Sequence, residues 1–196
     1  MKIAGGELRG RRLKVPAKGV RPTGERVREA IFSMLGSERV ADAEVLDLFA
    51  GSGALGLEAW SRGAGRVTFV EKHRKGTALI KENIRELCGK GAPLEAMIGD
   101  AAGYLKRNSL ARRFDIIFAD PPYYEEWLRK MLEALSEGDA LGPDGVLVFE
   151  QHRREPMAEV LAEFEEVFKL TKDKLYGTTR VLFIQRIEGS TSPLVT

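Results

Sequence analysis

Apolar residues recur along most of the chain in two alternating patterns, short continuous runs and runs with helical spacing. The continuous runs predict strands, which we expect at 45–49, 66–71, 94–98, 114–119 and 145–150. Apolar residues three and four positions apart predict helices, which we expect at 54–62, 77–88, 101–107, 125–135 and 156–164. Strands that are apolar on both faces and alternate with helices indicate an α/β fold, with a mostly parallel sheet covered by helices on both faces.

The two ends of the chain depart from this alternation. Residues 1–15 alternate around three glycines and predict a small β-hairpin, and Thr23 can cap a helix that continues to position 35. Near the other end, 167–176 and 179–186 predict a closing hairpin, so at least one strand is antiparallel. We therefore predict three parts: an arm and linker over 1–22, one domain over 23–188 and a flexible tail over 189–196.

Charge is distributed unevenly along the chain, with an excess of positive residues near the amino terminus. Residues 1–30 contain nine lysines and arginines against three glutamates, a net charge of +6, whereas the whole chain has a net charge of +2. The remaining residues therefore carry a net charge of −4. A basic arm on a mildly acidic body predicts contact with a polyanion such as a nucleic acid, although a solvated surface arm fits the same composition.

Composition narrows the class of protein. Hydrophobic residues make up 43% and charged residues 31% of the chain, which is typical of a globular protein in water. The single cysteine, Cys88, excludes an intramolecular disulfide and fits a reducing cytosol. The first residues lack an apolar signal segment, and no run approaches the length of a membrane span, so we expect a cytoplasmic protein. His73 and His152 lack metal-ligand spacing, so we predict no metal site.

The first predicted strand ends in a glycine-rich segment, DLFAGSGALG at 47–56. Gly51 and Gly53 permit a tight turn that a ligand can approach closely, between the strand and the following helix. Glu71 ends the next predicted strand, 20 positions after Gly51, where its carboxylate can hold the two hydroxyls of a ribose. A structural turn, a dinucleotide site and an S-adenosylmethionine site all remain compatible with these residues.

Two further carboxylates favour S-adenosylmethionine. Asp47 precedes Gly51 by four residues and can meet the ammonium of the cofactor, directly or through water. Asp100 follows the third predicted strand and can accept a hydrogen bond from the adenine amine, although it is equally suited to cap a helix. The predicted cofactor-binding residues are Asp47, Phe49, Ala50, Gly51, Ser52, Gly53, Glu71, Lys72, Asp100 and Ala101.

The fourth predicted strand ends in the most specific motif of the chain, Asp120-Pro121-Pro122-Tyr123. The two prolines remove two N–H donors, which leaves a rigid rim of acceptors formed by the Asp120 carboxylate and a backbone carbonyl. Two acceptors that form hydrogen bonds with the N–H groups of an aryl amine localise the nitrogen lone pair. The ring of Tyr123 can stack on the base. Such a rim suits an amine, whereas attack at a base carbon would require a nucleophilic cysteine, and Cys88 is predicted to be a core residue.

The sequence resembles, over about 1–186, the RsmD family of bacterial 16S rRNA guanine-N2 methyltransferases, which belong to the class I amino-methyltransferases. The glycine loop and the Asp-Pro-Pro-Tyr motif carry the general resemblance. The narrower resemblance is carried by GRRL at 10–13, RPT at 21–23, RVREA at 26–30, GALGLEA at 53–59, VE at 70–71, YG at 176–177 and TR at 179–180.

The resemblance implies a Rossmann-like, seven-stranded sheet with an antiparallel last strand and an N-terminal hairpin arm. It implies that Asp120 and Pro121 hold the guanine amine beside Pro122, that Tyr123 stacks on the base, and that S-adenosylmethionine is the methyl donor. The implied substrate is guanine 966 of 16S rRNA in the small ribosomal subunit, flipped out of its stack. The residues then expected to contact RNA are Arg9, Arg11, Arg12, Lys14, Arg21, Thr23, Arg26 and Arg28.

Three alternative functions remain open at this point. An amino-methyltransferase acting on adenine N6 in DNA or RNA, or on glutamine, uses the same acceptor rim because each substrate offers a planar amine. A nicotinamide oxidoreductase explains the glycines but leaves Asp-Pro-Pro-Tyr without a role. A non-catalytic RNA-binding protein of ribosome assembly is disfavoured by the intact carboxylates at positions 47, 71, 100 and 120. We expect the protein to be a monomer that does not associate with a membrane.

Overall fold

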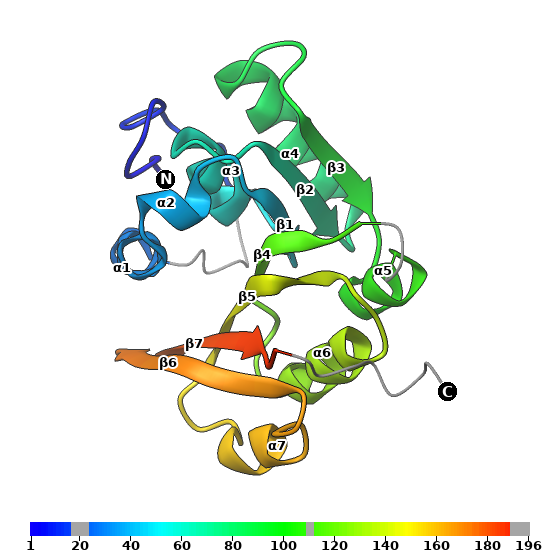
Figure 1. Ribbon diagram of the computed structural model, residues 1–196. Coiled ribbons are helices and arrows are strands. Elements are labelled where there is room, and N and C mark those ends of the chain that lie inside the picture. The colour runs from blue at the N-terminus through cyan, green and yellow to red at the C-terminus, as the bar shows by residue number, and fades with distance from the viewer. Residues whose placement is uncertain (17–23, 109–111, 189–196) are drawn as a thin grey trace. The chain divides into compact units, whose positions relative to one another are not determined.

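The computed structural model describes residues 1–16, 24–108 and 112–188 (Figure 1). The chain forms two compact units, Met1–Ala101 and Ala102–Thr196. The predicted linker with Arg21 and Thr23, and the predicted tail at 189–196, fall outside the described residues. In the described ranges, no helix combines the length and apolar character that crossing a membrane requires.

The first unit is built on three parallel strands with the order β3-β2-β1. The helices α3 and α4 pack on these strands and contribute buried side chains to the core. Figure 1 shows α4 running along β2 and β3. The exposed side chains of Met97 and Ile98 mark β3 as an edge strand. The elements are α1 (Glu25–Leu35), α2 (Ser37–Val40), β1 (Glu44–Leu48), α3 (Ala54–Ser61), β2 (Arg66–Glu71), α4 (Arg74–Leu87) and β3 (Leu94–Ile98).

The first residues form a short antiparallel hairpin, closed by the bridge between Lys2 and Arg12. The Leu13 N–H donates to the carbonyl of Met1 across this hairpin. Ile3 and Leu13 are almost fully buried, so the hairpin contributes apolar side chains to the core while its arginines remain outside.

The second unit contains four strands with the order β4-β5-β7-β6. β4 and β5 are parallel, whereas β7 runs antiparallel to both β5 and β6, as expected for the closing hairpin. The short helix α7 packs on β6. The elements are α5 (Ala101–Asn108), β4 (Phe114–Ala119), α6 (Trp127–Ser136), β5 (Leu141–His152), α7 (Ala158–Ala162), β6 (Phe168–Tyr176) and β7 (Thr179–Arg186).

The predicted α/β class with seven strands is therefore confirmed, and β2, β3, β4 and β7 have the predicted bounds. One predicted bound is wrong: the strand expected at 145–150 begins four residues earlier, because β5 spans Leu141–His152. Phe114 pairs with Leu141 and Ile116 with Val146, so the register shifts and the extra residues are accommodated within the strand. The short helix α2 was not predicted, because four residues are too few to show a helical period.

Candidate functional site

The glycine loop connects β1 to α3 in the first unit. Phe49, Gly51 and Gly53 have positive φ angles of 58°, 56° and 79°, a conformation that glycine adopts without strain. The Gly53 N–H donates to the carbonyl of Ala50 at 2.7 Å, which closes the turn immediately before the first residue of α3. Ser52 is buried beneath the turn. The predicted strand–turn–helix context of this loop is therefore present.

Glu71 lies against this loop, as its position at the end of β2 predicts. Its Oε2 accepts a hydrogen bond from the Gly51 N–H at 2.9 Å, and its Oε1 accepts one from the His73 N–H at 2.8 Å. The side chain is buried. The fold thus brings together the carboxylate and the loop, two features that the sequence separates by 20 positions.

Asp47 occupies the end of β1 and is almost fully buried. Its Oδ2 accepts a hydrogen bond from the Gly56 N–H at 2.9 Å, so the carboxylate also holds the first turn of α3 in place. A Cβ at Gly56 would lie 2.3 Å from the Phe69 ring. Because glycine has no Cβ, α3 can pack closely on β2 at this position. The cofactor contact expected of Asp47 stays a prediction.

Asp100 is exposed where the chain leaves β3, and Lys72 is exposed beyond β2. The Gly99 N–H donates to the carbonyl of Glu71 at 3.2 Å, which ties the segment before Asp100 to the end of β2. Three carboxylates, at positions 47, 71 and 100, therefore lie at or just beyond the carboxyl ends of three neighbouring strands. Because these carboxylates are negatively charged acceptors, they fit a ligand with an ammonium, a sulfonium, ribose hydroxyls and an adenine amine better than they fit a pyrophosphate.

The Asp-Pro-Pro-Tyr motif follows β4 in the second unit. Asp120 is half-buried, Pro121 is buried and Pro122 is exposed. The Tyr123 hydroxyl lies 3.1 Å from Oγ1 of Thr179, at the start of β7, and this hydrogen bond fixes the tyrosine ring. The rigid rim predicted from the sequence is thus positioned at the carboxyl end of a buried strand.

Sequence reasoning missed three side chains around this motif. Thr179 anchors the hydroxyl of Tyr123, the ring of His152 lies 5.5 Å from the Tyr123 ring, and Tyr124 lies 5.2 Å from His152, measured between ring centroids. The tyrosine doublet at 123–124 was the available signal for Tyr124. Thr179 belongs to the TR segment at 179–180 that carries the resemblance, but neither it nor His152 reveals its contact with the motif locally, because their pairing across β5 and β7 is a property of the sheet.

The basic residues of the hairpin form an exposed surface, defined by Arg9, Arg11, Arg12 and Lys14. Lys14 already forms ion pairs with Glu82 and Glu86 of α4. These pairs raise the pKa of Lys14, with the Glu86 hydrogen bond as the largest cause. Arg26, on α1, is also exposed. The RNA contacts expected of these residues stay predictions.

Arg28 departs from the predicted set. Its side chain is fully buried and forms an ion pair with Glu58 of α3, with Nε and Oε2 3.1 Å apart. It also donates to the carbonyl of Lys2, so it binds the hairpin to the rest of the first unit. Because its guanidinium does not reach the surface, we remove Arg28 from the expected RNA contact and assign it a structural role.

Asn83 is a second buried polar residue that sequence reasoning missed. Its Nδ2 donates to the carbonyl of Ser52 at 2.9 Å and to the carbonyl of Lys14 at 3.0 Å. Its Oδ1 accepts from the Lys14 N–H at 2.9 Å. One side chain of α4 therefore connects the glycine loop with the end of the basic hairpin.

Cys88 ends α4 and is half-buried. Burial raises the pKa of its thiol to about 11, despite the opposing charge of Arg11. A thiol with such a pKa remains neutral near pH 7 and is a poor nucleophile. The core position predicted for Cys88 is wrong, because the residue is only half-buried at the carboxyl end of α4. Within the described ranges, no group of three or more histidines, cysteines and acids is placed to hold a metal ion.

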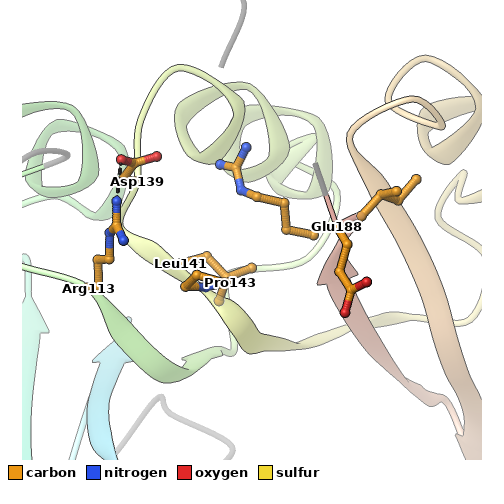
Figure 2. A pocket seen from close by; sticks show the side chains of 7 residues that line it. Arg113, Asp139, Leu141, Pro143 and Glu188 are labelled. Atoms are coloured by element: carbon orange, nitrogen blue, oxygen red, sulfur yellow. Dashed lines mark hydrogen bonds and ion pairs between the residues drawn. The ribbon is translucent and has the colours of Figure 1, made fainter. Parts of the chain in front are cut away.

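A cavity of about 190 Å³ lies in the second unit, at the end of the strands opposite to the Asp-Pro-Pro-Tyr motif (Figure 2). Arg113 and Leu141, which line it, lie at the amino ends of β4 and β5. Figure 2 shows Arg113 paired with Asp139, and Nη2 and Oδ2 lie 2.8 Å apart. Arg186 donates to the carbonyls of Leu135 and Gly138 and so completes the end of α6. Ligands bind at the carboxyl ends of strands in open α/β sheets, so we assign this cavity a structural role.

Comparison with known proteins covers nearly the whole chain. Residues 1–185 match the model of the family described as Conserved hypothetical protein 95. Ribosomal RNA small subunit methyltransferase D of Haemophilus influenzae is 33% identical over 90% of this chain and 89% of its own length. The protein of the same name from Escherichia coli K12 is also 33% identical, over 95% of this chain and 90% of its own length.

Solved structures also match nearly the whole chain. The protein yhhF from Escherichia coli matches with a TM-score of 0.79 and 32% identity, over 95% of this chain and 97% of that chain. A hypothetical protein from Thermus thermophilus matches with a TM-score of 0.78 and 29% identity, over 94% of this chain and 99% of that chain. The chain therefore belongs to the Conserved hypothetical protein 95 family, the RsmD family of S-adenosylmethionine-dependent methyltransferases.

Proposed function

We propose that this protein transfers a methyl group from S-adenosylmethionine to the exocyclic N2 amine of one guanine in 16S rRNA of the small ribosomal subunit. The resemblance designates this guanine as 966. The proposal includes a cytoplasmic location and a monomeric enzyme. The observation that carries it is the rim at 120–123, which ends β4 and is held by the hydrogen bond between Tyr123 and Thr179.

The rim determines the kind of acceptor. The Asp120 carboxylate and the carbonyl of Pro121 each accept one N–H of the guanine amine, which draws the amine nitrogen from planar towards tetrahedral geometry. The nitrogen lone pair is thereby turned out of conjugation with the base. Tyr123, whose hydroxyl is fixed, stacks on the base and excludes water from the amine. An acceptor rim rejects a keto oxygen at the same place, because two acceptors would face each other.

The first unit provides the cofactor-binding residues of the proposal. When bound, S-adenosylmethionine would supply a methyl group on its sulfonium sulfur for transfer to the amine nitrogen. Glu71 binds the ribose hydroxyls, Asp47 the ammonium and Asp100 the adenine amine. The loop with Gly51 and Gly53 leaves room for the methionine end, because it carries no Cβ at these positions.

The basic hairpin supports an RNA substrate. Arg9, Arg11 and Arg12 are exposed on a hairpin whose backbone is anchored in the first unit, so they can contact phosphates at a defined place. The relatives from Haemophilus influenzae and Escherichia coli bear the name of a small-subunit rRNA methyltransferase. The charge pattern and the names of the relatives point to the same class of substrate.

The test is transfer of labelled methyl from S-adenosylmethionine to small ribosomal subunits, free 16S rRNA and DNA, each prepared without prior methylation. We expect label on the rRNA, recovered as N2-methylguanosine after digestion and absent with the Asp120→Ala variant. Label recovered as another methylated base, or on DNA or protein, would contradict the guanine assignment. Absence of label on every substrate, with cofactor binding demonstrated, would contradict the enzymatic proposal itself.

A further inference from the structure

The loop that follows the Asp-Pro-Pro-Tyr motif exposes an aromatic side chain in a strained position. Tyr124 has 65% of its side chain exposed, more than any other large hydrophobic residue among the described ranges. Its φ angle is +65°, in the left-handed region that bulky residues rarely adopt, and Glu126 has a φ of +53° in the same loop. Strained backbone of this kind clusters where a ligand is bound.

Two rings contact Tyr124, those of His152 and Tyr123. The Tyr124 and His152 centroids lie 5.2 Å apart with the planes tilted by 45°, and Tyr123 meets Tyr124 edge-on at 6.3 Å. His152 is itself held, because its Nδ1 accepts a hydrogen bond from the Arg154 N–H at 3.2 Å. The two ring contacts leave the greater part of the Tyr124 surface exposed to solvent.

The position of this aromatic cluster follows from the sheet. His152 and Thr179 are paired across β5 and β7, so their side chains lie on the same face at the end where the Tyr123 hydroxyl is bound. Two exposed cations, Arg153 and Arg154, follow His152 directly. An exposed aromatic surface beside cations is the chemistry that binds single-stranded nucleic acid, where bases stack and phosphates are neutralised.

We infer that Tyr124 is a second stacking surface, which binds the nucleotide adjacent to the target guanine in the RNA strand. This inference rests on the proposed function, since it assigns the neighbouring base and not the methylated one. The Tyr123 and Tyr124 centroids are 6.3 Å apart and the ring planes are nearly perpendicular, so the two rings offer separate faces to two bases that are not stacked on each other. A base flipped onto Tyr123 leaves its neighbour unstacked, and Tyr124 replaces the lost stacking partner.

The decisive variant is Tyr124→Gly, because glycine accepts the left-handed φ without strain while the ring is lost. We expect the KM for methylation of small subunits to rise roughly 5- to 150-fold, the effect of losing one stacked base, with kcat changed by less than about two-fold. Tyr124→Phe keeps the ring and should leave KM within about two-fold of the unmodified protein. Leu175→Ala removes another exposed apolar side chain of the same unit and serves as the control, with no change expected.

The possible results separate this inference from the proposed function. Methyl transfer by the unmodified protein with an unchanged KM in Tyr124→Gly overturns the inference and leaves the function intact. A fall in kcat without a rise in KM also overturns it, because Tyr124 would then position Tyr123. Failure of the unmodified protein to label rRNA contradicts the function. If Tyr124→Gly raised the KM for a protein substrate instead, the group bound by Tyr124 would belong to a polypeptide and not to RNA.

Discussion

At the scale of single residues, buried carboxylates of this protein have partners that define their roles. Glu58 accepts hydrogen bonds from Ala4 and Gly5 and pairs with Arg28, so both of its oxygens are used within the fold. Glu71 instead binds backbone N–H groups at the edge of the glycine loop. Each carboxylate oxygen has more than one acceptor site, so Glu71 can still accept ribose hydroxyls.

The first residue-scale prediction concerns Asp120. Replacing it by alanine removes one of the two acceptors proposed to hold the amine, so methyl transfer should fall on the order of 100-fold or more, by analogy with the loss of one preorganised polar group. Binding of S-adenosylmethionine should change little, because the predicted cofactor-binding residues lie elsewhere in the chain. Labelled-methyl transfer and calorimetric binding measure the two effects. Equal loss of both would contradict the assigned role.

The second residue-scale prediction concerns Cys88. Burial raises its pKa from 9.0 to about 11, so the neutral thiol favours the folded state below pH 9, and this contribution is lost as the pH rises towards 11. Near pH 8 the thiol should react with iodoacetamide roughly tenfold more slowly, or slower still, than a free cysteine peptide. Cys88→Ala should retain methyl transfer. Loss of activity in this variant would indicate a covalent mechanism.

At the scale of elements, the hairpin is secured by side chains of α3. Glu58 and Ser61 bind its backbone: the Leu8 N–H donates to Oγ of Ser61 at 2.9 Å, and that hydroxyl lies 2.6 Å from the carbonyl of Gly5. Arg62 contributes a second ion pair to Glu58, with Nη2 and Oε1 2.9 Å apart. The hairpin is therefore a rigid extension of the unit, which suits a surface that must present arginines in one geometry.

The first element-scale prediction tests this attachment. Glu58→Gln leaves the fully buried Arg28 without its counter-charge, so the free energy of unfolding should fall by about 3–5 kcal/mol. The matched control is Arg113→Gln, which breaks an exposed pair with Asp139 and should cost less than about 1 kcal/mol. Urea unfolding measures both. An equal effect of the two substitutions would show that the buried network does not secure the hairpin.

The second element-scale prediction tests the exposed face of the hairpin. The double variant Arg11→Gln and Arg12→Gln should weaken RNA binding and reduce the slope of log affinity against log salt by roughly 1–2, since each lost phosphate contact removes about 0.7–0.9. Lys106→Gln with Arg113→Gln removes the same charge from the second unit as a control. A filter-binding series over salt concentrations measures the slope, and an unchanged slope would place the RNA elsewhere.

At the scale of the whole molecule, ligand binding is coupled to stability. In the proposed function, the carboxylates at positions 47, 71 and 100 favour S-adenosylmethionine over a nicotinamide dinucleotide, whose phosphates they would repel. At a hundredfold excess over Kd, S-adenosylmethionine should stabilise the fold by about 2.7 kcal/mol, which raises Tm by roughly 5–10 °C for a chain of this size. NADH should produce no shift. A shift with NADH alone would restore the oxidoreductase alternative.

Several parts of the fold and site were predictable because their signals are local. Apolar runs located the buried strands to within a few residues, since a strand covered on both faces tolerates few polar side chains. The glycine loop and the Asp-Pro-Pro-Tyr motif were predictable because each is a short segment that depends on backbone restrictions of glycine and proline. The irregular start of β5 was missed because its register shift depends on pairing with β4.

By itself, the sequence determined the α/β class, the position of the two motifs at strand ends and the basic character of the first residues. Only the tertiary structure decided which charged and aromatic residues face solvent. Arg28 and Arg12 look alike in a basic segment, yet one is buried beside Glu58 and the other is exposed. The reason is that a side chain's environment is set by partners distant in sequence, such as Glu58 for Arg28 and Thr179 for Tyr123.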